Sequence, residues 1–236
     1  MEDAFSATLK GLDDPATQVK ELPFSFLSVL PVTGASVSTL GGFLGSQTIS
    51  ATDKAAAWLD ELQFDLGEGP CWDAMRLDRP VMEPQMLGRR GTERWPAFGR
   101  AVQSGPIASI FAFPLAVGSL RFGAIDLYSD LPVTLDRVQT TRAAALAAVV
   151  ARRVLRDRIG ELEVPDESAL SPFSRRKVHQ ATGIVLAQLN IDADEARLLL
   201  HSHAFATESS VMEVADGVLA GQIVFSNDSG PIEVDT

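Results

Sequence analysis

The chain contains a single cysteine, Cys71, within the segment Gly-Glu-Gly-Pro-Cys-Trp at residues 67–72. The two glycines and the proline predict a tight, irregular loop that leads into a short helix. A thiol at a helix N-terminus can have a lowered pKa and act as a redox sensor, but a lone cysteine there is more often a small buried residue. We therefore favour a buried Cys71.

No second group accompanies Cys71 to form a catalytic site. The three histidines, His179, His201 and His203, all lie in the C-terminal part of the chain. On a helix, residues two apart point about 200° apart, so His201 and His203 cannot share a metal ion. The sequence also has no P-loop, GxGxxG or HExxH motif. We predict no catalytic residues, no metal and no cofactor, and hence no enzyme.

The formal net charge of −11 argues against a broad basic surface for polyanions. A local basic patch remains at Arg175-Arg176-Lys177. This patch falls in the first turn of a predicted helix, where cations oppose the helix dipole, so it suggests an anionic partner. The alternative is an ordinary solvated first turn.

Cysteine content and hydropathy bear on the compartment. One cysteine cannot form an internal disulfide, and residues 1–14 lack the apolar core of a signal peptide. The longest apolar run, residues 143–151, is too short to cross a bilayer. We predict a cytoplasmic protein without a membrane-spanning segment.

Periodicity and turn residues predict the elements that position these groups. Asp53 is a candidate N-cap for one of the helices. We expect helices over residues 4–12, 53–64 and 95–103, and one starting at Cys71; and extended segments over residues 24–30, 35–40, 45–50, 80–84, 107–115 and 120–128.

Residues 135–163 contain no proline and are rich in alanine and arginine, which predicts one long helix. At 1.5 Å per residue it would be about 43 Å long. The helix either packs on the sheet or, given its length, connects domains or forms a dimer seam. An approximate apolar stripe consists of Val138, Ala145, Val149, Leu155, Ile159 and Leu162.

Beyond a predicted linker at residues 164–168, three helices are expected. The first starts at Ser171-Pro172 and ends at Asn190. Asp192 with Glu195, and Ser210 with Glu213, have the spacing of capping boxes at the starts of the second and third helices. The tail from Ser226 is polar and acidic, which favours fraying.

Several motifs resemble a known family. LDELQFDLGEGPCWDA, RWPAFGRAVQSGPIASIFAFPLAVGSLRFGAIDLYSD and ATDKAAAWLDE are similar to the GAF domains of actinobacterial GAF–ANTAR regulators, from about Pro31 to Ser129. RRKVHQATGIVLAQLNIDADEARLLLHSHAFATESSVMEVADGVL resembles an ANTAR domain, from about Pro172 to Leu219.

The resemblance implies an α+β fold: a GAF-like antiparallel sheet with flanking helices, a long connecting helix and a three-helix ANTAR-like domain. We place the GAF-like domain at residues 1–133, the connecting and dimerisation helix at 134–163, the linker at 164–171, the ANTAR-like domain at 172–225 and the acidic tail at 226–236. It further implies a homodimer that senses a signal and binds paired hairpin loops in leader RNA.

The basic content of the ANTAR-like part is low. Between Ser174 and Ser226 the chain has four basic and six acidic residues, a net charge of −2. Phosphate contacts supply much of the affinity for RNA, so binding must be weak or focused on few residues. The candidate RNA-binding residues are Arg175, Arg176, Lys177, His179, Arg197 and His201.

The candidate GAF loop and pocket residues are Gly67, Glu68, Gly69, Pro70, Cys71 and Trp72. The residue after Cys71 is tryptophan, not the histidine usual in bilin attachment, and no cyclic-nucleotide signature or haem-ligating histidine is present in this part. The small-molecule ligand stays open, and so does a GAF domain without one.

The sequence thus predicts a signal-responsive transcription antitermination regulator that binds leader RNA through its ANTAR domain. The alternative is a sensory or protein-interaction module whose ANTAR domain no longer binds RNA.

Overall fold

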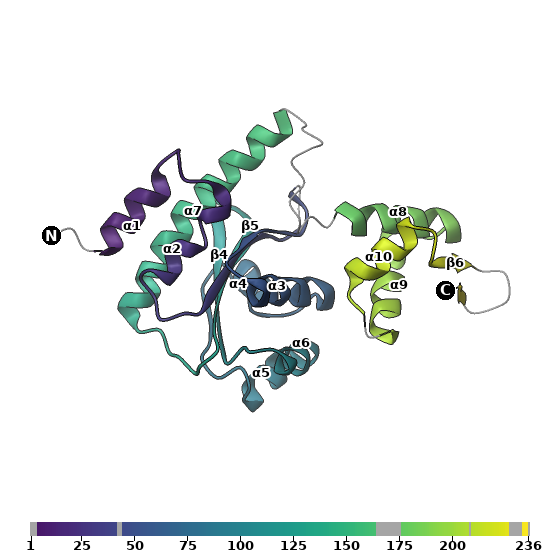
Figure 1. The fold of residues 1–236 in the computed structure, drawn as a ribbon, viewed down its shortest axis with the longest axis horizontal. Coiled ribbons are helices and arrows are strands. Elements are labelled where there is room, and N and C mark those ends of the chain that lie inside the picture. The colour runs from purple at the N-terminus through teal and green to yellow at the C-terminus, as the bar shows by residue number, and fades with distance from the viewer. Residues whose placement is uncertain (1–3, 42–43, 164–175, 208, 227–232, 236) are drawn as a thin grey trace. The chain divides into compact units, whose positions relative to one another are not determined.

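The computed structural model describes residues 4–41, 44–163, 176–207, 209–226 and 233–235. The chain divides into two compact units, Met1–Phe173 and Ser174–Thr236, which are considered separately (Figure 1). The predicted linker at 164–171 and the predicted helix start at Ser171-Pro172 lie outside the described residues.

A five-stranded antiparallel sheet forms the centre of the first unit, with strand order β2-β1-β5-β4-β3. The predicted pair of long apolar strands forms a hairpin that turns at Gly118, where φ is 61°. The neighbouring strand pairs with it from Gly34 opposite Tyr128 to Thr39 opposite Gly123. The strands are β1 (Gly34–Thr39), β2 (Gln47–Ala51), β3 (Val81–Glu83), β4 (Ser109–Val117) and β5 (Leu120–Ser129).

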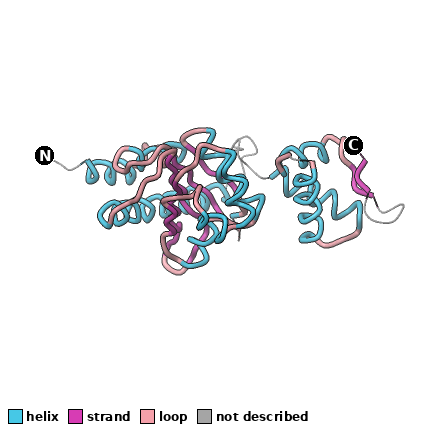
Figure 2. The backbone as a smooth tube through the Cα atoms, turned by 90° about the horizontal axis from the view of Figure 1, so that it is seen from below, coloured by secondary structure: helices cyan, strands magenta, loops and turns pink. Residues whose placement is uncertain are grey.

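Helices cover both faces of this sheet, as Figures 1 and 2 show. On one face Leu146, Val150 and Val154 join Phe111 and Phe113 in a large apolar core. The helices on that face are α1 (Ala4–Asp13), α2 (Phe24–Leu27) and α7 (Arg137–Glu163). On the other face lie α3 (Lys54–Leu66), α4 (Pro70–Leu77), α5 (Arg89–Arg94) and α6 (Pro96–Ala101). Short 3₁₀ turns occupy Val19–Glu21 and Val102–Ser104. The predicted α+β class, with an antiparallel sheet and flanking helices, is confirmed.

The strand predicted over residues 24–30 is wrong, because this segment begins with the short helix α2. Leu22, Phe26 and Leu30 are buried at a spacing of four, which is a helical period, while Phe24 is exposed. Ser25 Oγ and Ser28 Oγ donate to the carbonyls of Leu22 and Ser25. A short apolar run fits either element, so periodicity alone could not decide it.

The predicted long helix is confirmed as α7, but its buried face differs from the predicted stripe. Leu146, Val150 and Val154 face the sheet. Of the predicted stripe, Val149 is buried, whereas Val138 and Ile159 are 58% and 45% exposed. The helix thus packs on its own sheet and leaves part of the predicted stripe on the surface.

The described residues of the second unit form three helices around one apolar core that includes Val185, Leu200 and Val214. Asn190, with φ of 53°, ends the first helix as predicted. Both predicted capping boxes are present: Asp192 Oδ1 accepts from the Glu195 N–H at 2.8 Å, and Ser210 Oγ accepts from the Glu213 N–H at 3.1 Å. The helices are α8 (Arg176–Leu189), α9 (Ala193–Ala206) and α10 (Val211–Leu219).

Two short strands follow these helices, β6 (Val224–Ser226) and β7 (Glu233–Asp235), and they pair antiparallel. Phe225 of β6 is buried in the core of the unit. The strands were not predicted, because their sequence is too short and polar to stand out. Within the described part of the chain, no helix is long and apolar enough to cross a membrane.

Candidate functional site

The Gly-Glu-Gly-Pro segment joins three helices on one face of the sheet. Gly67 ends α3 in a left-handed conformation, with φ of 61°. Glu68 Oε1 accepts hydrogen bonds of 2.6 Å from the backbone N–H groups of both Ala97 and Phe98, in the first turn of α6. These N–H groups have no partner within their own helix, so Glu68 caps α6. Glu68 therefore has a structural task.

Gly69 and Pro70 start α4. Gly69 has φ of 137°, and a Cβ atom there would lie 2.6 Å from Gln63 Oε1. Pro70 occupies the first helical position, where the missing N–H costs nothing. Glycine at position 69 is thus required by both the backbone conformation and the close approach of Gln63.

Gln63 of α3 forms hydrogen bonds with Cys71 and Trp72, the two residues that follow Pro70. Its Oε1 accepts from the Cys71 N–H at 2.9 Å, and its backbone carbonyl accepts from Trp72 Nε1 at 2.7 Å. Its Nε2 donates to Asp126 Oδ2 of β5 at 2.6 Å. One buried glutamine therefore ties the α3–α4 loop to the centre of the sheet.

The favoured burial of Cys71 is confirmed. Its side chain is fully buried and packs in a small apolar cluster with Leu40, Phe64 and Ala124. Burial raises the pKa of the Cys71 thiol well above its ordinary value, and the nearby carboxyl groups of Asp126 and Asp60 raise it further. The thiol is therefore neutral at physiological pH, which makes it a poor nucleophile.

Two buried carboxyl groups lie beneath this loop. Asp60 of α3 accepts from Ser36 Oγ at 2.6 Å and from Thr48 Oγ1 at 2.9 Å. Burial raises the pKa of Asp60 to about 7. Burial, followed by the negative charge of Asp60, raises the pKa of Asp126 well above its ordinary value. Asp126 therefore keeps its proton to a higher pH than an exposed aspartate does.

Sequence reasoning missed this pair and Gln63. The available signal was an aspartate within the apolar strand FGAIDLYS, since a carboxyl group there must lie in the core or at a bend. Nothing in the sequence indicated that Asp60 would be its neighbour.

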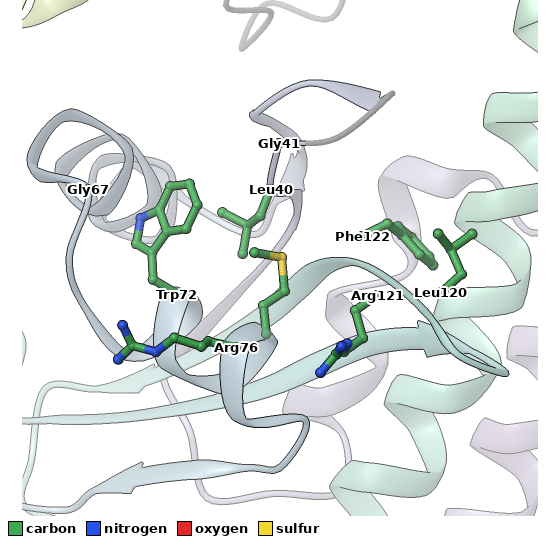
Figure 3. A pocket seen from close by; sticks show the side chains of 9 residues that line it. Leu40, Gly41, Gly67, Trp72, Arg76, Leu120, Arg121 and Phe122 are labelled. Atoms are coloured by element: carbon green, nitrogen blue, oxygen red, sulfur yellow. The ribbon is translucent and has the colours of Figure 1, made fainter. Parts of the chain in front are cut away.

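A hollow of about 580 Å³ opens beside the loop, between the end of β1, α4 and the start of β5 (Figure 3). Its apolar lining comes from Leu40, Trp72, Met75, Leu120 and Phe122. Arg76 and Arg121 supply the charged groups, and Gly41 and Gly67 complete the described lining. Of the predicted loop and pocket residues, Gly67 and Trp72 line this hollow. Glu68, Gly69, Pro70 and Cys71 do not, since they form the structure behind it.

In the second unit the candidate RNA-binding residues are spread over two helices. Lys177 lies at the start of α8, and its Nζ pairs with Asp216 Oδ1 of α10 at 2.7 Å. His179 of α8 and Arg197 of α9 are exposed, and His201 of α9 is half-buried. Arg175 lies outside the described residues, and for Arg176 only the backbone is described.

The outer face of α9 carries two large apolar side chains. Leu198 is 66% exposed and Phe205 is 84% exposed. They are seven residues apart, with His201 between them, so all three share one face of the helix. His203 instead packs edge to face on Phe225, with ring centroids 5.8 Å apart. Sequence reasoning missed Phe205, because exposure depends on how α9 packs.

Comparison with known proteins gives a domain match in the C-terminal part of the chain and solved structures that share a fold with this chain. Residues 173–219 match the model of the ANTAR domain. The crystal structure of the GAF domain from an Acinetobacter phosphoenolpyruvate-protein phosphotransferase superposes with a TM-score of 0.52 at 10% identity, covering 70% of this chain and 96% of that one. No curated protein sequence matches the chain.

A second solved structure gives the same result. The GAF domain of a phosphoenolpyruvate-protein phosphotransferase from Coxiella burnetii has a TM-score of 0.51 at 12% identity, covering 68% of this chain and 99% of that one. At such identities the likeness establishes the fold alone. The chain therefore consists of a domain with the GAF fold followed by an ANTAR domain.

Proposed function

We propose that the protein is a signal-responsive regulator of transcription antitermination, which binds leader RNA through its C-terminal unit while the GAF-fold unit senses a signal or joins two copies. The main observation that supports this proposal is the match of residues 173–219 to the ANTAR domain. ANTAR and GAF domains are regulatory and sensory modules, so the proposed role is not enzymatic. Its target is a nascent transcript, so it acts in the cytoplasm and away from membranes.

The outer face of α9 supports contact with RNA loops. Arg197 supplies an exposed cation, and Phe205 presents an aromatic ring to solvent. RNA-binding proteins recognise unpaired loop bases by stacking them on aromatic side chains. Such stacking contributes about 1–3 kcal/mol per base, which can offset a small number of phosphate contacts.

The start of α8 is the second part of the proposed interface. Arg175, Arg176 and Lys177 are consecutive and are three of the four basic residues between Ser174 and Ser226. The ion pair of Lys177 with Asp216 is between side chains that are 55% and 50% exposed, so it is weak and a phosphate can replace it.

RNA binding should be measured with the intact chain and a leader RNA containing two adjacent small hairpins. Replacing Arg175, Arg176 and Lys177 together with alanine should abolish measurable binding. The wild type should show a shallow dependence of log affinity on log salt, equivalent to about three or four phosphate contacts. Lys10→Ala/Lys20→Ala/Lys54→Ala, which removes the same charge from the first unit, is the matched control.

A separate variant tests stacking. Phe205→Ala removes the exposed ring from α9 and should weaken RNA binding by about tenfold or more, with no change in the salt slope. Phe24→Ala, which removes a ring that is 51% exposed on the first unit, should have no effect. Tight RNA binding that survives both the triple substitution and Phe205→Ala would place the RNA on another surface.

A second candidate function is a sensory or protein-interaction module whose ANTAR domain has lost RNA binding. The net charge of −2 between Ser174 and Ser226 favours it, as does the absence of any basic residue from the sequence 207–213. Failure of the intact protein to bind any paired-hairpin RNA at low salt, with candidate ligands present, would favour this function over the first.

We also propose that two copies associate through α7. Val138, Arg152 and Ile159 are exposed at spacings of fourteen and seven residues, and Ala145 between them is half-buried. Thr141 and Ala148, exposed, and Leu155, half-buried, repeat with the same period three residues later. A seven-residue repeat of this kind is typical of a coiled-coil seam. The exposed residues of this repeat lie opposite the face that packs on the sheet, and Leu155 at the margin also packs against the core.

A further inference from the structure

The hollow beside the α3–α4 loop has an unusual charge for this chain. It is lined by Arg76 and Arg121, and none of the described residues that line it carries a carboxylate. The whole chain has a net charge of −11, with 31 acidic residues against 20 basic ones. A concave site with two guanidinium groups and no carboxylate attracts anions even on an acidic protein.

Arg121 is the better placed of the two to receive an anion. It stands at the start of β5, its side chain is exposed, and it forms no ion pair with any residue that the structure describes. A guanidinium group can donate two parallel hydrogen bonds to a carboxylate or a phosphate. Arg121 therefore has its full charge and donor set available.

Arg76 adds a partly compensated charge. Its guanidinium pairs with Asp73, but Asp73 Oδ2 also accepts from Arg94 Nε and Nη2 at 3.1 and 2.9 Å. Two arginines thus share one carboxylate, which leaves a net positive charge in the group. The shared pairing also holds Arg76 in place beside the hollow.

The other walls are apolar and aromatic. In Figure 3, Trp72 and Leu40 lie above the side chain of Arg76. Arg121 lies to the right of Arg76, and Leu120 and Phe122 lie together beyond it. The hydrogen bond from Trp72 Nε1 to the Gln63 carbonyl fixes the indole ring. A volume of about 580 Å³ lies within the range that small-molecule sites occupy.

We propose that this hollow binds a small organic anion with a planar, apolar body. Its carboxylate or phosphate group meets Arg121 and Arg76, and its body lies against Trp72 and Met75. This inference deepens the proposed sensory role and rests on it, because it assigns the chemical class of the signal.

The test measures binding to the intact protein by calorimetry, with 1-naphthoate as the anionic probe and 1-naphthamide as its neutral counterpart. The acid should bind about tenfold tighter than the amide, since charge-assisted hydrogen bonds to arginine are the stronger ones. Arg121→Gln should remove most of this preference. Arg100→Gln, which removes an exposed arginine outside the hollow with the same change of charge, should keep it.

A second variant separates the site from the general charge of the protein. Met75→Glu introduces a carboxylate into the lining and should abolish binding of the acid while it weakens binding of the amide much less. Acetate, which has the charge without the body, should bind far more weakly than 1-naphthoate. Thermal melting of each variant checks that the fold is retained.

Three results would overturn the proposal: equal affinity for acid and amide, unchanged acid binding in Arg121→Gln, or no binding of either probe. These measurements contain no RNA, so they can fail while RNA binding by the C-terminal unit succeeds. Conversely, if the wild-type protein does not bind RNA, a positive result for anion binding in the hollow still stands.

Discussion

Substituting Asp126 with asparagine should stabilise the GAF-fold unit at alkaline pH. The asparagine side chain keeps an oxygen that can accept from Gln63 Nε2, as Asp126 Oδ2 does at 2.6 Å. The substitution also removes a carboxyl group whose burial and proximity to Asp60 raise its pKa well above the ordinary value. The variant thus imitates the protonated state at every pH.

The direction of the pH dependence follows from these pKa values. In the unfolded chain both aspartates lose their protons near pH 4, whereas in the folded protein burial raises the pKa of Asp60 to about 7 and raises that of Asp126 well above its ordinary value. The folded state therefore binds more protons above pH 4. The stability that the pair contributes is complete below pH 4 and is lost as pH rises through the folded pKa values.

The size of the pH dependence of stability is set by the number of protons that the protein takes up on folding. Each proton taken up on folding lowers the free energy of unfolding by about 1.4 kcal/mol per pH unit within its window. Asp126→Asn removes one of the two protons and also one potential negative charge beside Asp60. We expect the variant to match the wild type near pH 4.5 and to gain stability over it as the pH rises toward 8, by at most about 1.4 kcal/mol per pH unit.

Urea denaturation between pH 4.5 and 8.5, monitored by tryptophan fluorescence, measures this difference. The three tryptophans, Trp58, Trp72 and Trp95, all lie in the first unit, so the signal reports that unit alone. Asp13→Asn, at an exposed aspartate, controls for the change in net charge. A variant that is destabilised equally at both ends of the pH range would refute the reasoning, because Asp126 would then act as an ordinary charged acceptor.

The remaining predictions concern the loop, the thiol and the proposed dimer. Glu68→Ala leaves two N–H groups of α6 without their acceptor and should lower the free energy of unfolding by about 1–2 kcal/mol, whereas Glu68→Gln, which keeps an acceptor, should lose less. Cys71→Ala should cost about 1 kcal/mol and leave RNA affinity unchanged, and the native thiol should react slowly with iodoacetamide; rapid alkylation at neutral pH would instead indicate a sensor. Light scattering at tens of micromolar should show a dimer that becomes a monomer in Val138→Glu/Ile159→Glu but not in Leu87→Glu, where the exposed apolar side chain lies in the turn before α5. A wild-type monomer at that concentration would remove the proposed seam.

Local sequence patterns predicted the starts of α9 and α10 and the end of α8. Asp192 with Glu195 and Ser210 with Glu213 are three residues apart, so each capping box closes within one turn. The same holds for Asp53, whose Oδ1 accepts from the Ala56 N–H at 2.9 Å. Such signals need no knowledge of the rest of the fold, because both partners belong to the same helix start.

Apolar runs in the sequence also predicted the strands of the sheet. The strand predicted for the short apolar run at residues 24–30 was wrong. Its helical state depends on burying Phe26 and Leu30 together against the sheet and α7. The buried face of α7 was misjudged for the same reason, since a helix rich in alanine offers several faces with similar hydropathy and only the sheet selects one.

By itself, the sequence determined that a sheet domain, one long helix and a small helical unit follow one another, because periodicity and capping are local properties. Tertiary structure alone decided which distant residues meet. The α3 helix and β5 bring Asp60 and Asp126 together in the core, and the loop reaches Ala97 and Phe98 through Glu68. The hollow likewise joins Leu40, Trp72 and Arg121 from three separate segments. These contacts depend on strand order and register, which side-chain packing across the whole sheet selects and no short stretch of sequence encodes.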